Sequence, residues 1–423
     1  DDLADDDSAR TVWHFGGERR SPAQIVAALQ PLARRAQAQR DAIGDAAITY
    51  RSAPPAARAL DAISIADWLD ATGVGGWPRA LIDTAYTAEY GVELERQSAL
   101  NLVTALDPQP DASGVTGTSD ERYRIRGGND RIAAALGERL AGAIEPEAVL
   151  EALRQRRDGR YLCSFRRDGA STDVEAAQVV LAIPFTLLRQ VRLDVELPAA
   201  KSRAIATLGY GTNAKLVIPF AQRHWRIAHG ASGTVLTDGP LQLVWDAMRR
   251  QPGAAGALTQ YLGGRRGVAL GSGAPHAHAR DAIGELDSIF GGIAAHADAA
   301  RAVRMHWPTQ RWALGSYSCY LPGQWCAVRG AEGEAVEGLF FAGEHCSLDA
   351  QGFIEGACSS GEDAARQVLA SRVRAARARA PTGPGPFRAA PSTPSFRASS
   401  SPARLSASSS SRTASARTAT ASG

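Results

Sequence analysis

The most informative pattern in the chain is a continuous apolar run that leads through a polar turn into a helix with many small residues. Residues 338–342 contain the run Leu-Phe-Phe, which predicts a strand covered on both faces. Gly343 ends this strand, and Gly352 precedes a helix that is predicted to begin near Phe353. Because the first turns of that helix carry mainly Gly, Ala and Ser, a phosphate or a flat ring can approach its N–H groups. A tightly packed corner without a ligand explains the same spacing equally well.

Helical periodicity dominates the first third of the chain, after a short strand predicted at residues 12–15. Ser21 and Pro22 suit the N-cap and the first position of a helix over residues 23–39. Three further helices are predicted over residues 61–72, 78–90 and 94–106.

A strand–turn–helix pattern follows at residues 123–140. A short strand leads into a Gly-Gly turn, and Asn129 or Asp130 caps the helix. Val149 then begins the next predicted strand. An ordinary structural corner accounts for this pattern, so the pattern by itself assigns no function.

Alternating apolar and polar positions predict a mainly β region from residue 159 to residue 307. Residues 159–165 and 176–183 suit a hairpin followed by a buried strand that stops at Pro184. Further strands are predicted over residues 214–221, 233–237, 241–246, 257–262 and 302–307, with a helix over residues 279–290. Turn signals between these strands indicate a mixed sheet that forms the floor of a substrate cavity.

Composition is that of an ordinary globular protein. With 423 residues, 44% of them hydrophobic, the chain can bury a large core and is expected to form two domains. No apolar run approaches the roughly 18 residues of a membrane span. The five cysteines form no CxxC pair, which predicts reduced thiols in a cytoplasmic protein rather than a disulfide framework or a metal site.

The last part of the chain has a different composition. After Asp363 there is no Asp or Glu, and from about residue 372 the chain consists mainly of Ala, Arg, Ser, Thr and Pro. Such a segment cannot bury enough apolar surface to offset the entropy of ordering. We therefore predict a disordered, basic tail over residues 373–423. Because a preference for Arg runs through the whole chain, we expect no specific nucleic-acid partner for this tail.

Lysine is rare: the 47 basic residues include only Lys201 and Lys215 as lysine. Lys201 follows a Pro-Ala-Ala turn and is expected to be solvated. Lys215 lies within TNAKLVIPF, a predicted strand with apolar neighbours. A half-buried lysine shifts its pKa easily whereas arginine stays charged, which favours a chemical role for Lys215. A lysine at a strand edge that reaches water is the structural alternative.

Aromatic residues are dense between Trp307 and Trp325, where three Trp and two Tyr lie within 19 residues. A core aromatic cluster is the ordinary explanation.

Three segments together carry a family resemblance: FAGEH at residues 341–345, FIEGA at 353–357 and SGEDAA at 360–365. They resemble the C-terminal flavin-binding segment of the flavin-containing amine oxidases. The resemblance implies an α/β fold with an FAD-linked domain and a helical plus mixed-sheet substrate domain. It implies FAD as cofactor, a small-molecule amine and O2 as partners, and oxidation of a C–N bond. A primary or secondary amine or an amino acid would become an imine while O2 is reduced to H2O2.

The resemblance also assigns catalytic roles to individual residues. Lys215 lies at the position of the family's active-site lysine, which holds a water against flavin N5. Tyr317 follows Trp307 by ten residues, where the family places one wall of an aromatic cage over the flavin. Phe353 lies at the position of the opposite wall. Monoamine oxidases have two Tyr in this cage, so the Tyr and Phe here leave the amine open.

The cofactor-binding positions implied by the resemblance are Val149, Trp307, Gly343, Glu344, Phe353 and Ile354. Glu344 is expected at the ribityl–diphosphate region of FAD and Val149 beside its adenine end. Ser316 stands where monoamine oxidases carry the cysteine that tethers the flavin. We therefore expect non-covalent FAD.

One family element does not occur in these 423 residues: the strand–GxGxxG–helix unit that binds the FAD pyrophosphate. We therefore expect an incomplete dinucleotide-binding domain. The expected parts are a mainly helical segment (1–125), a return to the FAD domain (126–190), a mixed-sheet substrate segment (191–306), a C-terminal FAD-binding segment (307–372) and the tail. The alternative is a non-catalytic fragment, or a subunit that needs a separate dinucleotide-binding chain; a homodimer is a further option. A related flavin desaturase is a third alternative.

Overall fold

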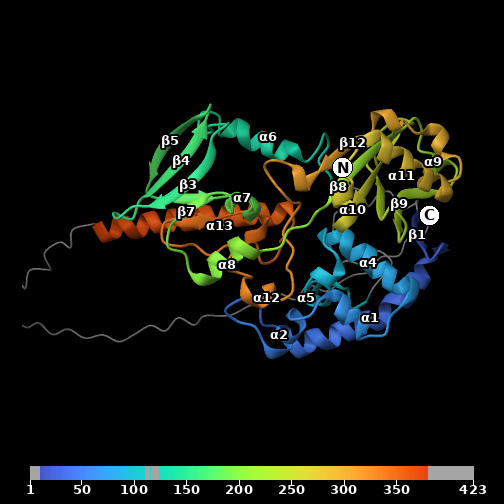
Figure 1. The fold of residues 1–423 in the computed structure, drawn as a ribbon, viewed down its shortest axis with the longest axis horizontal. Helices are drawn as coiled ribbons and strands as arrows, with labels where there is room; N and C mark the ends of the chain where they lie inside the picture. Colours follow the sequence, from blue (N-terminus) through green and yellow to red (C-terminus); the bar gives the residue numbers. More distant parts are fainter. Residues whose placement is uncertain (1–9, 110–114, 116–122, 380–423) are drawn as a thin grey trace, which may run out of the picture. The chain divides into compact units, whose positions relative to one another are not determined.

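The computed structural model describes residues 10–109, 115 and 123–379. The chain divides into a first unit, Asp1–Ala375, and a second unit, Ala376–Gly423. The first unit contains every described element except the last residues of one helix (Figure 1). The predicted disorder of residues 380–423 lies outside the described residues. None of the described helices has the length and apolar character needed to cross a membrane.

An N-terminal group of helices shares one hydrophobic core. Its members are α1 (Pro22–Ile43), α2 (Pro55–Asp61), α3 (Ile65–Asp70), α4 (Gly76–Tyr90), η1 (Leu94–Arg96) and α5 (Ala99–Ala105). Ser21 caps α1 through a capping box with Gln24, which confirms the predicted start of this helix. Leu29, Trp68 and Leu81 lie in the core that these helices enclose.

Two of the predicted helices in this group are broken. The predicted helix over residues 61–72 is wrong at its start, because α2 ends at Asp61 and α3 begins after its N-cap, Ser64. Asp61 is buried, and its carboxylate accepts a hydrogen bond from Ser98 Oγ at 2.7 Å. The predicted helix over residues 94–106 divides into η1 and α5. Side-chain hydrogen bonds between distant residues therefore override the local helical pattern.

A seven-stranded sheet follows the order β12-β8-β11-β10-β9-β1-β2. Its strands are β1 (Arg10–Phe15), β2 (Glu18–Arg20), β8 (Ala214–Phe220), β9 (Ala231–Thr237), β10 (Leu243–Asp246), β11 (Gly256–Leu262) and β12 (Val303–His306). β1 and β9 run parallel, whereas the other neighbouring pairs run antiparallel. The predicted mixed sheet is therefore confirmed.

Side chains along β8 alternate between two faces of this sheet. Ala214, Leu216 and Ile218 are buried in a core that they share with α11 (Pro275–Ile289). Lys215 points to the opposite, half-buried face, because successive strand residues alternate.

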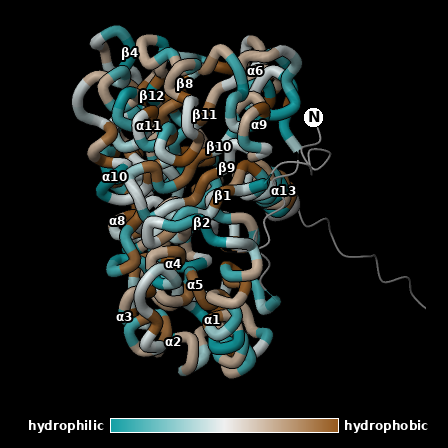
Figure 2. Tube along the Cα trace, turned by 90° about the vertical axis from the view of Figure 1, so that its right-hand side faces the viewer, coloured by the Kyte–Doolittle hydropathy of each residue, from teal (hydrophilic) through white to brown (hydrophobic). Residues whose placement is uncertain are grey.

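The short helices of this region are α9 (His224–Ile227), α10 (Gly264–Ala269), η2 (Ile293–His296) and η3 (Ala299–Arg301). Figure 2 shows polar and apolar stretches following one another along the chain.

Two smaller sheets lie in the remaining part. One has the order β5-β4-β3-β7, and the other pairs β13 with β6 in parallel. Their strands are β3 (Val149–Gln155), β4 (Tyr161–Arg167), β5 (Ala170–Ala176), β6 (Val179–Leu181), β7 (Arg192–Asp194) and β13 (Leu339–Phe341). The accompanying helices are α6 (Asp130–Arg139), α7 (Phe185–Leu188), α8 (Ala199–Thr207), η4 (Trp307–Thr309), α12 (Gln324–Ala327), η5 (Glu344–Cys346) and α13 (Ile354–Arg379).

Three expectations for this part need correction. β13 is buried as predicted, but β6 leaves Val180 44% exposed, because among the described strands β6 pairs with β13 alone. Residues 124–129 form no strand before α6. The helix α13 continues to Arg379, so disorder is the wrong prediction for residues 373–379. The Ala and Arg residues there have high helix propensity.

Lys201 is buried, which corrects its predicted solvation. It lies in α8 with 2% of its surface exposed. Its Nζ donates to the Glu332 carbonyl at 2.5 Å and lies 3.5 Å from the centroid of the Phe341 ring. Burial lowers the pKa of Lys201 to about 8. The Pro-Ala-Ala segment opens a helix rather than a solvated turn, and this helix directs Lys201 toward β13.

Candidate active site

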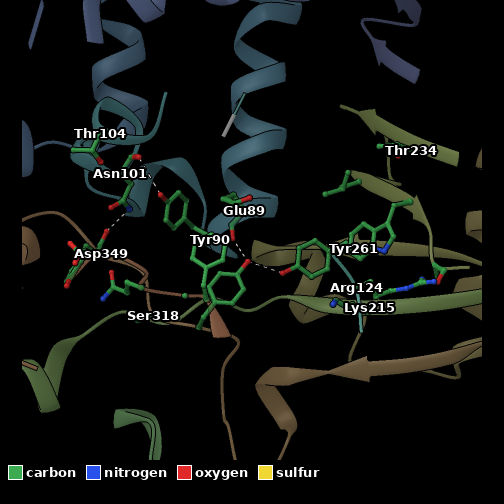
Figure 3. Close-up of a pocket in the computed structure, with 18 of the residues that line it drawn as sticks. Glu89, Tyr90, Asn101, Thr104, Arg124, Lys215, Thr234, Tyr261, Ser318 and Asp349 are labelled. Carbon is green, nitrogen blue, oxygen red and sulfur yellow. Dashed lines mark hydrogen bonds between the residues drawn. The ribbon is translucent and has the colours of Figure 1, made fainter. Parts of the chain in front are cut away.

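A cavity of about 800 Å³ is lined by the seven-stranded sheet, the helical group and the C-terminal segment (Figure 3). The sheet contributes Lys215, Ser232, Thr234, Leu243, Trp245, Asp246 and Tyr261, the helices contribute Glu89, Tyr90, Asn101 and Thr104, and the C-terminal segment contributes Tyr317, Ser318, Tyr320, Trp325, Gln351, Gly352 and Phe353. The three residues predicted as catalytic, Lys215, Tyr317 and Phe353, therefore line one cavity although they lie far apart in the chain.

Lys215 enters this cavity from β8, the strand next to the edge strand β12. Its partner across the antiparallel β8–β11 ladder is Tyr261. The Nζ atom lies 5.4 Å from the centroid of the Tyr261 ring and 5.5 Å from that of Trp245. A cation within about 6 Å of an aromatic face is attracted by the ring quadrupole. The ammonium is therefore held at the aromatic side of the cavity.

Tyr317 lies opposite, on the segment that follows η4. Backbone hydrogen bonds fix this segment: Gly211 N donates to the Tyr317 carbonyl at 2.9 Å, and Ser316 N donates to the Gly211 carbonyl at 2.9 Å. The Tyr317 hydroxyl lies 2.9 Å from the Tyr261 hydroxyl and also donates to the Glu89 backbone carbonyl. Burial, and then the neighbouring Tyr261, raise the pKa of Tyr317 well above its ordinary value. Tyr317 is therefore a neutral, fixed phenol.

Phe353 lies where the chain enters α13. The side chain is 39% exposed and lines the cavity, whereas Ile354 begins the helix, is 53% exposed and does not line it. Gly352 has a φ of +87°, and a Cβ there would lie 3.8 Å from the Tyr317 ring. The positive φ favours glycine, whereas a Cβ there would make only an ordinary van der Waals contact with Tyr317.

Glu344 holds two parts of the site together. Its carboxylate accepts hydrogen bonds from Ser318 N at 3.0 Å, Ser318 Oγ at 2.8 Å and Gly352 N at 2.7 Å. Burial raises the pKa of Glu344, and these hydrogen bonds oppose the rise. Gly343, immediately before it, has a φ of +133° and donates its N–H to Ser360 Oγ at 3.0 Å. The cofactor contacts predicted for Glu344 and Gly343 remain predictions.

Val149 and Trp307 do not line this cavity. Val149 begins β3 and lines a separate cavity of about 570 Å³ together with Arg166 and Trp312. Trp307 begins η4, and its carbonyl accepts the Gly315 N–H at 3.3 Å. The roles predicted for both residues toward FAD stay predictions.

Sequence reasoning missed Trp245, Tyr261 and Glu89. The two aromatic residues lie 5.2 Å apart between ring centroids and flank Lys215. Tyr261 lies in a predicted strand, but only the register of that strand places it opposite Lys215. Glu89 acts through its backbone carbonyl, which leaves no signature in the sequence.

The cavity wall fits the ring end of a flavin. The Gln351 side chain lines the cavity beside the Tyr320 hydroxyl, and its hydrogen bond to that hydroxyl opposes the rise in the pKa of Tyr320 that burial causes. An amide side chain at the wall of the cavity suits the polar edge of a flat ring, because it can both donate and accept hydrogen bonds. In the part of the chain that the structure describes, no group of His, Cys, Asp or Glu could hold a metal ion.

Solved structures share this α/β fold. Cyclohexylamine oxidase from Brevibacterium oxydans IH-35A superposes with a TM-score of 0.72 at 19% identity, covering 87% of this chain and 82% of that chain. Putrescine oxidase, in a structure with bound putrescine, superposes with a TM-score of 0.70 at 20% identity, covering 86% and 81%. At these identities the similarity establishes the fold alone.

The chain belongs to the family of flavin containing amine oxidoreductases, which matches residues 1–369. A putative flavin-containing monoamine oxidase AofH of Mycobacterium tuberculosis is 25% identical over 321 residues, covering 74% of this chain and 67% of the relative. A putative L-amino-acid oxidase YobN of Bacillus subtilis is 25% identical over 251 residues, covering 58% and 52%. Human amine oxidase [flavin-containing] B is 21% identical over 261 residues, covering 60% and 48%. The chain thus spans about two thirds of the mycobacterial relative and about half of the other two.

Proposed function

We propose that this chain carries the substrate cavity and the flavin-ring side of an amine oxidase. The reaction is oxidation of the C–N bond of a primary or secondary amine or an amino acid to an imine. The observation that carries the proposal is the meeting of Lys215, Tyr317 and Phe353 at one cavity. FAD, when bound, would accept a hydride from the carbon next to nitrogen and pass two electrons to O2, which forms H2O2.

The chain's own residues supply position and electrostatics. Lys215, which lies against Trp245 and Tyr261, would bind a water at the flavin ring. Tyr317 and Phe353 would guide the amine toward that ring, because aromatic faces attract a polarised nitrogen. The Gln351 side chain, which lines the cavity, would hold the edge of the flavin ring. No acid–base pair is required if the amine arrives neutral.

We further propose that the FAD is bound without a covalent bond. Ser316, at the position of the monoamine oxidase cysteine, donates its hydroxyl to Asn213 Oδ1 at 2.6 Å. Cys319 is the nearest thiol in sequence, but it is 1% exposed, and burial raises the pKa of its thiol. A buried, protonated thiol is a poor nucleophile.

The phosphate end of FAD needs a binding segment, and the usual one, a GxGxxG turn before a helix, does not occur in these residues. The sequence contains no GxGxxG, so a dinucleotide-binding segment in cis or on another chain would complete the cofactor site.

A flavin spectrum combined with a peroxide assay tests the proposal. The protein would be prepared with a strand–GxGxxG–helix segment supplied, loaded with FAD and mixed with a panel of amines and amino acids. We expect bleaching of the flavin absorbance without oxygen, and amine-dependent H2O2 with oxygen. A flavin-loaded protein that none of the amines reduces would support the non-catalytic alternative.

A further inference from the structure

We propose that Tyr261 is a positioning residue of this site, which holds the Lys215 ammonium with its ring and the Tyr317 hydroxyl with its own hydroxyl. The inference rests on the proposed function, since it concerns how two residues assigned there are oriented. Neither the sequence pattern nor the family resemblance assigned a role to Tyr261.

The Tyr261 ring is one of two aromatic rings that lie beside the Lys215 Nζ atom. Lys215 and Tyr261 are directly paired across two antiparallel strands, so their side chains share one face of the sheet. The Trp245 ring packs against Tyr261 at 5.2 Å between centroids and at an interplanar angle of 61°. Both rings lie within 5.5 Å of Nζ. The ammonium is therefore attracted to two aromatic faces at once.

The hydroxyl of Tyr261 reaches the opposite wall of the cavity. It lies 2.9 Å from the Tyr317 hydroxyl, which itself donates to the Glu89 carbonyl. Because a phenol carries one proton and that of Tyr317 goes to Glu89, Tyr261 is the donor within the hydroxyl pair. Tyr317 is thus tied to helix α4 on one side and to strand β11 on the other.

These two contacts can be separated by mutation. Tyr261→Phe removes the hydroxyl and keeps the ring beside Lys215, whereas Tyr261→Leu removes both. If Lys215 serves the reaction with O2 and Tyr317 guides the amine, Tyr261→Phe should affect only the reaction with the amine, whereas Tyr261→Leu should affect both half-reactions. A residue with a merely structural role would affect both half-reactions together or neither.

The kinetic test uses the FAD-loaded protein. We expect Tyr261→Phe to slow flavin reduction by the amine about threefold to tenfold, the size of one lost hydrogen bond, and to leave reoxidation by O2 unchanged. Tyr261→Leu should slow both steps. Tyr161→Phe is the matched control, because this buried tyrosine has its hydroxyl 3.5 Å from the Val336 carbonyl and does not line the cavity. Equal rates for Tyr261→Phe and wild type would overturn the proposal.

A double-mutant cycle shows whether Tyr261 acts through Tyr317. In a Tyr317→Phe background, Tyr261→Phe should cause no further slowing of flavin reduction, because the hydroxyl pair is already gone. Additive effects of the two substitutions would show that Tyr261 acts independently of Tyr317, which contradicts the proposal.

A second readout does not need activity. With 3-fluorotyrosine incorporated, the ¹⁹F resonance of Tyr317, assigned by its loss in Tyr317→Phe, should shift in Tyr261→Phe and stay unchanged in Tyr161→Phe. An unshifted Tyr317 resonance would overturn the hydroxyl pairing. If wild type makes no peroxide but the resonance shifts, the proposed function fails while the pairing stands.

Discussion

The carboxylate of Glu344 accepts hydrogen bonds from both the N–H and the hydroxyl of Ser318, at 3.0 and 2.8 Å. Ser318 directly follows Tyr317, and the same carboxylate also accepts the N–H of Gly352, which precedes Phe353. One side chain therefore joins the segments that carry the two predicted aromatic walls of the cavity.

We predict that Glu344→Ala lowers the free energy of unfolding by about 2 kcal/mol, because three donors lose a charged acceptor in a largely buried place. Urea unfolding measures this change. Glu138→Ala is the control, since Glu138 is exposed on α6 and should change stability little. Equal stabilities for both variants would mean that water replaces the carboxylate without cost.

Lys215→Met should slow flavin reduction by the amine or flavin reoxidation by O2 about 10²-fold, as expected when a reacting group loses its position. Its effect on the unfolding free energy should be small, because Met keeps the aliphatic stem in place. Stopped-flow absorbance of the flavin separates the two steps.

The control for Lys215→Met must be an exposed residue, which excludes the buried Lys201. Arg203→Met on α8 is suitable, because Arg203 is exposed. Rates for Lys215→Met that match those of Arg203→Met would remove Lys215 from the site.

The burial of Lys201 predicts a pH-dependent stability. Its pKa falls from 10.5 to about 8 in the folded chain, chiefly because burial penalises the ammonium. Between these pH values the unfolded chain binds more protons at this site, so the site's contribution to stability rises with pH. We expect an increase on the order of 2 kcal/mol from pH 8 to pH 10.5.

Urea unfolding of wild type and Lys201→Met at several pH values isolates this contribution as a difference in slope. Glu332 accepts the Tyr320 hydroxyl at 3.0 Å, and burial raises its pKa to about 7 from 4.5. The Glu332 carboxyl changes stability with pH in the opposite direction to Lys201, because its contribution to the free energy of unfolding falls as pH rises from 4.5 to 7. Parallel slopes above pH 8 for wild type and Lys201→Met would contradict the assignment to Lys201.

Acid precipitation of the FAD-loaded protein should release the flavin into the supernatant, because Ser316 cannot form the thioether and the Cys319 thiol is buried. Flavin absorbance that stays with the denatured polypeptide would identify a covalent bond. Peptide mapping of the Cys319→Ser variant would then show whether that thiol forms it.

Residues 1–423 alone should bind FAD weakly, show no oxidase activity and tend to aggregate. The GxGxxG cradle does not occur in them, and the β6–β13 sheet leaves Val180 44% exposed. Supplying a strand–GxGxxG–helix segment, fused or as a separate chain, should give yellow, soluble protein, as gel filtration with detection of flavin absorbance would show. Stoichiometric FAD on the unassisted chain would contradict this expectation.

Local pattern in the sequence determined the direction of Lys215 and six of the seven strands of the large sheet, all except β2. The alternation along residues 214–221 is enough to place Lys215 on the face opposite the buried residues of β8. The start of α1 at Pro22 and the buried run of β13 also followed from local signals, a capping box and three consecutive apolar residues. Such features depend on neighbours within a few positions, so the sequence alone reveals them.

Only the tertiary structure decided where the polar side chains find partners. Lys201 is buried against the Phe341 ring. Asp61 accepts a hydrogen bond from Ser98 where a continuous helix was predicted. Glu344 accepts a hydrogen bond from Ser318. The pairing of Tyr261 with Lys215 likewise needs a strand register that joins residues 46 positions apart, and the contact between the Tyr261 and Tyr317 hydroxyls joins residues 56 positions apart. The physical reason is that a buried polar group must be satisfied by whatever donor or acceptor the folded chain brings near it, and periodicity along the sequence carries no information about that partner.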